Sequence, residues 1–196
     1  MVEHPLLDRG RHLGRARQRR RRPGARRLDE DNQLALGALL ERRRYPYGQL
    51  RDRSRTLAEA GIGWVRSLFG GRGSFSITAH GGYQYATSRG DGNSTVYGLT
   101  LNLDYTFTDR LAGFVFAWWE RDDFNTDRIH FHPDALDEGV ILRRRDNLYE
   151  FGGGLVWEFV KTWSLRPQII YTRDQSNSVN FNYSATEVWV NVRKAF

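Results

Sequence analysis

The stretch Thr95–Phe107, TVYGLTLNLDYTF, alternates between large apolar and smaller or polar side chains along its length. From Tyr97 onward, every second position up to Phe107 carries leucine, tyrosine or phenylalanine. Successive side chains of a β-strand point to opposite faces of the sheet, so this stretch predicts a strand with one apolar and one polar face. The apolar face needs hydrocarbon or a packed core, and the polar face needs water or a polar lumen.

The same period of two recurs along the chain and predicts about eight antiparallel strands. They are Gln33–Glu41, Leu57–Leu68, Ser74–Thr87, Thr95–Phe107, Leu111–Arg121, Asn147–Phe159, Trp163–Thr172 and Ser184–Phe196. Gln33–Glu41 is also compatible with a short helix, because leucine and alanine favour helices. Eight strands would close into a small barrel if Gln33–Glu41 paired with Ser184–Phe196, and we expect instead an incomplete part of a larger barrel.

Aromatic residues and connection lengths favour a transmembrane barrel over a soluble β-sandwich. Aromatic side chains stand at both ends of the predicted strands, where a membrane places them at headgroup depth. Short connections (Phe69–Gly73, Thr108–Arg110, Val160–Thr162) alternate with longer polar ones (Arg42–Arg55, Ser88–Ser94, Asp122–Asp146, Arg173–Asn182). Bacterial outer-membrane barrels show this asymmetry, with the short turns in the periplasm. The sequence therefore predicts an all-β, antiparallel transmembrane barrel located in the outer membrane.

The chain ends on Phe196, after a strand with Val188, Val190 and Val192 on one face. Outer-membrane barrels end on such a strand with a terminal aromatic residue at the periplasmic interface. We therefore expect Phe196 to act as an assembly signal read by the barrel assembly machinery. Outer-membrane lipids are the other expected partner.

The first 30 residues differ from the rest in charge. They hold ten arginines and four acidic residues, a net charge of +6 out of +7 for the whole chain, and no apolar stretch typical of a signal peptide. We expect residues 1–30 to be a disordered Arg-rich arm, arising from a mis-called start or shifted frame, and residues 31–196 to be the barrel. A functional tail and a nucleic-acid-binding segment are the alternatives; lacking interleaved aromatic residues, the arm predicts no nucleic-acid partner.

The second half of the chain, roughly Asn93–Phe196, carries a set of motifs that extends to its last residue. The motifs are Gly139–Asp146 (GVILRRRD), Leu148–Phe151, Leu155–Trp157, Trp163–Tyr171 (WSLRPQIIY), Ser176–Ser178 and the terminal Phe196. In this order they resemble the barrel end of the surface lipoprotein assembly modifier family, in which the barrel follows tetratricopeptide repeats. The resemblance implies that the protein assists lipoproteins across the outer membrane to the cell surface, with surface lipoproteins as partners and no chemistry of its own.

A polar lumen follows from the same resemblance, and five charged residues are its candidate lining. They are Asp104, Glu150, Glu158, Arg166 and Arg193. Such residues would shape a polar passage, or pair with one another and merely fill a narrow barrel. A passive porin-like channel or a structural barrel is the alternative function.

Catalysis and metal binding have weaker support in the sequence. His80 lies on the polar face of its strand near Ser76 and Thr78, and His130-Phe-His132-Pro-Asp134 offers two histidines and a carboxylate. No spacing matches a barrel enzyme, and a solvated loop accounts for the histidine pair. We therefore expect no catalytic, cofactor-binding or metal-ligating residues.

Overall fold

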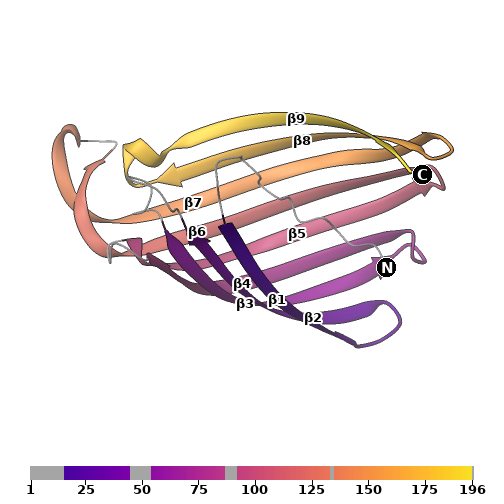
Figure 1. The fold of residues 1–196 in the computed structure, drawn as a ribbon, viewed down its shortest axis with the longest axis horizontal. Helices are drawn as coiled ribbons and strands as arrows, with labels where there is room; N and C mark the ends of the chain where they lie inside the picture. The colour runs from indigo at the N-terminus through magenta and orange to yellow at the C-terminus, as the bar shows by residue number, and fades with distance from the viewer. Residues whose placement is uncertain (1–15, 45–53, 87–91, 133–134, 196) are drawn as a thin grey trace.

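The computed structural model describes residues 16–44, 54–86, 92–132 and 135–195. These residues form nine strands and a short 3-10 helix (Figure 1). The strands are β1 Ala16–Arg27, β2 Asn32–Arg44, β3 Arg55–Leu68, β4 Gly73–Ala86, β5 Ser94–Thr108, β6 Leu111–His132, β7 Ala135–Val160, β8 Trp163–Ser176 and β9 Tyr183–Lys194, and the 3-10 helix η3 is Val179–Phe181. Within these residues no helix has the length and apolar character to cross a membrane.

All nine strands belong to one antiparallel sheet in sequence order, from β1 to β9. Each strand pairs with its neighbours in the chain, as in an up-and-down barrel. The sheet curls but is not closed: β1 and β9 are its two edges (Figure 1). The all-β, antiparallel, incomplete barrel predicted from the sequence is confirmed. The alternative closure is not formed, because β2 pairs with β1 and β3.

Strand β1 lies inside the segment that the sequence analysis assigns to a disordered arm. Ala16 pairs with Arg44 and Arg27 with Gln33, so the arm supplies a ninth strand to the edge of β2. The hydrogen bonds between β1 and β2 join main-chain groups and do not depend on the side chains. A search for alternating apolar and polar side chains therefore could not detect strand β1. The turn that follows is held by Asp29, whose carboxylate accepts hydrogen bonds from the backbone N–H of Asp31 and Asn32 at 2.9 and 2.7 Å. Hydrogen bonds from Asn32 and these amides lower the pKa of Asp29.

Strands β6 and β7 are longer than predicted. The segment Asp122–Asp146, expected to be a loop, instead continues both strands into a long hairpin with register shifts at Asp123/Asp127 and His130/His132. The prediction was wrong because the alternation stops where the strands leave the apolar layer. Backbone pairing continues there without it.

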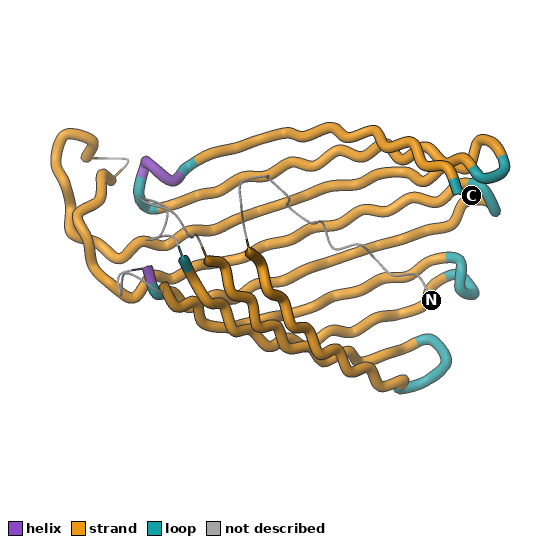
Figure 2. Tube along the Cα trace, viewed as in Figure 1, coloured by secondary structure: helices purple, strands orange, loops and turns teal. Residues whose placement is uncertain are grey.

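Connections differ in length between the two ends of the sheet. Figure 2 shows compact turns at one end, here called the turn end, and the long β6–β7 hairpin with η3 at the other, the loop end. At the turn end, Gly70 and Gly71 have φ of 64° and 89°, a conformation that glycine adopts without a Cβ penalty. Strand β9 runs back to the turn end, and Phe196 itself lies outside the described residues.

Burial is reversed relative to a soluble protein. On β5, Leu99, Leu101 and Leu103 are 38–41% exposed and define the outer face of the sheet. Within the strands, the opposite, inner face carries the most buried side chains. These are Glu41, Gln84, Ser94, Val96, Glu150, Ser164, Ile170, Thr172 and Ser176. A sheet that exposes leucine and valine and buries polar groups requires a hydrocarbon environment on its outer face.

Two groups of aromatic side chains bound the apolar outer face. Near the loop end, Tyr97 packs edge-to-face on Trp119, and near the turn end Tyr105 packs on Phe107. The roughly ten residue steps from Tyr97 to Phe107 correspond to about 34 Å along a strand, and a tilt of about 40° reduces this to about 26 Å. This height matches the apolar band of an outer-membrane barrel, so the aromatic groups lie at the two membrane interfaces.

Candidate channel lining

Two of the residues predicted to line a lumen, Asp104 and Glu150, lie on the inner face of the sheet. Asp104 of β5 lies opposite Phe114, and Glu150 of β7 lies opposite Trp118 in the register of β6. Ser74 donates a hydrogen bond of 3.3 Å to the Asp104 carboxylate, and Thr172 donates one of 3.3 Å to Glu150. Glu150 is 5% exposed, so its carboxylate is part of the packed wall.

The other three predicted lining residues lie nearer the turn end. Glu158 and Arg193 are exposed, with Arg193 opposite Ser164 across the β8–β9 pair. Arg166 is half-buried, and its Nε is buried with no hydrogen-bond partner among the described residues. The five residues are therefore spread over β5, β7, β8 and β9 at different heights rather than gathered at one point.

An acidic band near the loop end was missed by the sequence analysis. It consists of Glu59, Glu120, Asp122, Asp146 and Asp174, all on the inner face by register. The sequence did contain a signal for this band. Glu120 and Asp122 are the next alternate positions after Trp118, so a longer strand would have placed both on the same inner face. Ending the predicted strand at Arg121 placed Asp122 and Asp146 in a loop and hid the band.

Mutual repulsion and burial perturb two carboxyl groups of this band. On β6 the apolar outer face ends at Trp119, and Arg121 and Asp123 flank Asp122, so Asp122 lies beyond the membrane-spanning segment. Burial, with the charge of Glu120, raises the pKa of Asp122 to about 7. Asp174 lies likewise beyond Tyr171 on β8, and burial together with the charge of Asp146 raises its pKa to about 6.

Arg144 provides positive charge beside the acidic band. Its guanidinium stacks between two rings, 3.8 Å from the centroid of Phe124 and 3.9 Å from that of Phe181, and forms a 2.9 Å ion pair with Asp146. These contacts tie η3 to β6 and β7. The connection between β8 and β9 is thereby held against the loop end of the wall.

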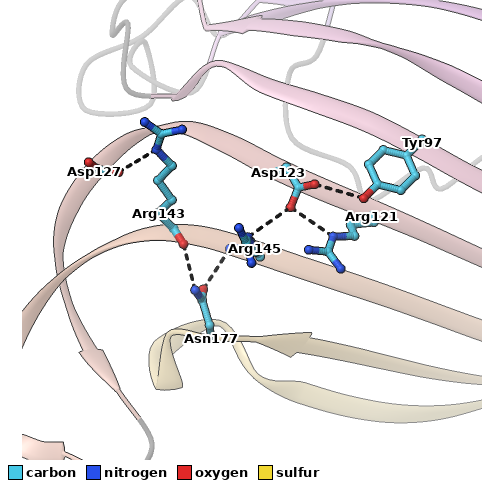
Figure 3. A network of polar contacts seen from close by, with 7 residues as sticks. All are labelled: Tyr97, Arg121, Asp123, Asp127, Arg143, Arg145 and Asn177. Atoms are coloured by element: carbon cyan, nitrogen blue, oxygen red, sulfur yellow. Dashed lines mark hydrogen bonds and ion pairs between the residues drawn. The ribbon is translucent and has the colours of Figure 1, made fainter.

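A second polar network lies on the other side of the sheet at the same end (Figure 3). The Asp123 carboxylate accepts hydrogen bonds from the Tyr97 hydroxyl at 3.0 Å and from Arg121 Nε at 3.0 Å, and Arg145 lies 3.6 Å away. A separate ion pair of 2.8 Å joins Arg143 to Asp127. Asp123 is four positions from Trp119 on β6 and therefore lies on the same outer face. Its contacts form a charged rim just beyond the aromatic residues.

Glycines on the inner face lie beside aromatic rings. A Cβ at Gly152 would lie 2.5 Å from the ring of Phe116, and one at Gly154 would lie 3.0 Å from Phe114. The rings of β6 thus occupy space left by β7. The inner wall there combines aromatic surface with the carboxylates of Asp104 and Glu150.

The serine and histidine considered for catalysis have other partners. The Ser76 hydroxyl accepts a hydrogen bond of 3.1 Å from Asn102, and His80 Nε2 lies 3.5 Å from a carboxylate oxygen of Glu120. The side chains of His130, His132 and Asp134 lie outside the part of the chain whose side chains are described. In the described residues, Ser76 is thus hydrogen-bonded to Asn102 and His80 is paired with Glu120.

The fold is similar to a solved structure, the outer membrane channel DcaP of Acinetobacter baumannii. The similarity has a TM-score of 0.61 at 12% sequence identity and covers 88% of this chain and 50% of DcaP. The chain thus spans about half the length of that channel. No curated protein matches the sequence.

A family model matches residues 41–196, under the description Putative beta-barrel porin 2. With the DcaP-like fold, this match confirms the predicted outer-membrane location and barrel class. The comparisons do not show the surface lipoprotein assembly modifier family, which stays a resemblance. On the match over most of its length, the chain belongs to the Putative beta-barrel porin 2 family.

Proposed function

We propose that the nine-stranded sheet forms part of the wall of a passive solute channel in the outer membrane. The observation that carries this proposal is the reversal of burial, with apolar side chains exposed on the outer face and polar side chains on the inner face. A wall of this kind separates lipid from water. Membership of a porin family and the fold of a channel support the same function.

Closing the wall requires strands beyond the nine described. The edges β1 and β9 present backbone groups that hydrocarbon cannot satisfy, at a cost of several kcal/mol for each unsatisfied group. Further strands therefore pair with these edges in the membrane. Their source, in this polypeptide or another, does not change the role of the inner face.

The acidic band gives the channel a preference for cations. Five carboxylates on the inner face near the loop end outnumber the basic side chains Arg43, Arg55 and Arg144 described in the same region, and Arg43 is paired with a further carboxylate, Glu41. A ring of carboxylates raises the local concentration of cations in a narrow pore.

Conductance in planar bilayers tests the proposal. Protein purified from the outer membrane with the strands that close its wall, and shown to be folded by heat-modifiable migration on gels, should give stepwise conductance with higher permeability for K⁺ than for Cl⁻. Replacing Asp122→Asn together with Asp174→Asn should lower this ratio, whereas Asp123→Asn on the outer face should leave it unchanged. A closed, folded barrel that gives no conductance steps would refute the channel.

Lipoprotein display, the role implied by the family resemblance, has no support from a described contact. It would be favoured over the channel only if folded protein without conductance restored surface exposure of a lipoprotein in cells that lack the gene.

A further inference from the structure

Three potential metal ligands meet on the inner face near the loop end. Glu59 of β3, His80 of β4 and Glu120 of β6 place one ligand atom each within 4.8 Å of one another. His80 and Glu120 are half-buried, with side-chain exposures of 16% and 23%. The three residues lie far apart in the sequence, and only the sheet brings them together.

The register of the sheet explains how they meet. His80 pairs with Gly98, and Gly98 pairs with Glu120, so a glycine separates the two ligands across the sheet. Glu59 pairs with Gly82, two positions from His80 on the same face. Because glycine has no side chain, the side chains of Glu59, His80 and Glu120 can extend across the glycine positions toward a common point.

The two glycines are needed for this arrangement. A Cβ at Gly98 would lie 2.9 Å from His80 Nε2 and would overlap the carbonyl oxygen of Trp119. A Cβ at Gly82 would lie 2.7 Å from Cγ of Glu59 and would overlap the carbonyl oxygen of Ala58. Any other residue at either position would displace a ligand side chain.

We propose that Glu59, His80 and Glu120 bind one Zn²⁺ ion on the inner wall of the barrel. An imidazole nitrogen with two carboxylates is a ligand set that zinc accepts, whereas Ca²⁺ and Mg²⁺ select oxygen ligands alone. Tetrahedral zinc with bonds of about 2.0–2.2 Å places its ligands about 3.4 Å apart. His80 Nε2 and the Glu120 oxygen are already 3.5 Å apart, and the Glu59 ligand atom lies within 4.8 Å of both, so the main adjustment is a closer approach of the Glu59 carboxylate.

The charge of the surroundings favours a cation at this point. Asp122 is electrostatically coupled to Glu120 on the same strand and to Arg55 of β3. A divalent ion would neutralise the two glutamates and reduce their repulsion with the acidic band. Three protein ligands would leave one coordination position open toward the lumen.

The competing account is an ion pair of His80 with Glu120 that only holds β4 to β6. Both accounts predict destabilisation when His80 is removed, so stability alone does not separate them. The two accounts are separated by the number of metal ions bound and by the effect of replacing one ligand residue.

The test measures zinc bound to the full chain folded in detergent micelles, by isothermal titration and elemental analysis. Wild type should bind one zinc ion at this cluster, and His80→Ala or Glu120→Gln should weaken binding about tenfold or more. Thr78→Ala, on the same face of β4, and the double change His130→Ala with His132→Ala should leave this binding intact.

A thiolate ligand sharpens the test. His80→Cys should retain metal binding and, with Co²⁺ in place of Zn²⁺, should add a sulfur-to-cobalt charge-transfer absorption that wild type lacks. Wild type without bound zinc, or binding unaffected by His80→Ala, would overturn the proposal. The measurement needs no conductance, so its failure and failure of the channel proposal are separate results.

Discussion

Two neighbouring isoleucines of β8 show how differently the two faces of the sheet are built. Ile169 on the outer face is 54% exposed, and Ile170 on the inner face is 6% exposed. The same contrast separates Leu101 from the buried Glu150. The inner face is crowded because the sheet curls around it, so hydrogen bonds and close packing stabilise it. The outer face has few protein contacts, and its stability depends on the surrounding hydrocarbon.

The largest effect is expected from a charge on the outer face. Leu101→Arg places a guanidinium near the middle of the apolar band, where arginine costs about 2–4 kcal/mol in a transmembrane barrel. We expect a strong loss of protein from the outer-membrane fraction and of heat-modifiable migration. Thr100→Arg, the adjacent inner-face position, should insert nearly normally. Equal loss from both variants would contradict the assignment of faces.

A smaller effect is expected from overpacking the inner face. Gly152→Val forces a side chain against the ring of Phe116 and should cost about 1–3 kcal/mol in unfolding by denaturant. Shortening the ring in the double variant with Phe116→Leu should recover part of the loss. Gly37→Ala, where no atom lies within 4 Å of the added Cβ, is the matched control and should change stability little. A similar loss in both glycine variants would argue against close packing as the cause.

Changes in pH should alter the inner face without altering the outer one. Because the pKa of Asp122 is raised to about 7 and that of Asp174 to about 6, both carboxyls are mainly neutral at pH 5 and charged at pH 8. The K⁺ to Cl⁻ permeability ratio should therefore rise between these values. Folded-state pKa values above the usual 3.8 also mean that the contribution of these groups to stability falls as pH rises from about 4 to 7. In the double variant Asp122→Asn with Asp174→Asn, the change in permeability ratio should be smaller; an unchanged pH response would assign it to other groups.

The smallest effect is expected at the outer rim. Asp123→Asn weakens its contacts with Arg121 and Arg145, whose side chains are 29% and 60% exposed. Solvent screens such pairs, so we expect a loss of about 0–1 kcal/mol that decreases further at high salt. Urea unfolding at low and high ionic strength measures it. A loss of several kcal/mol would place the rim among the structural elements that hold the barrel.

Alternation in the sequence was sufficient to predict the strand class and the two faces of the sheet. Aromatic residues at the strand ends and the alternation of short and long connections then predicted the outer-membrane location. The alternation of side chains also placed Asp104 and Glu150 on the inner face, because the parity of a residue within a strand depends only on its own neighbours. The short turns at Phe69–Gly73 and Thr108–Arg110 followed from breaks in that alternation. Fold class and compartment were therefore local properties of this sequence.

Which residues meet across the sheet was decided by the tertiary structure. Alternation gives the face of His80 but not its register against β5 and β6, so its approach to Glu120 could not be predicted. The strand formed by Ala16–Arg27 and the extension of β6 and β7 were missed for a related reason. Main-chain hydrogen bonds can add a strand to any exposed sheet edge, whatever its side chains are. Beyond the apolar layer, paired strands also lack the alternation of apolar and polar side chains that identifies a strand in the sequence. The sequence by itself determined what each strand shows to lipid and to the interior, and the pairing of strands decided which groups act together.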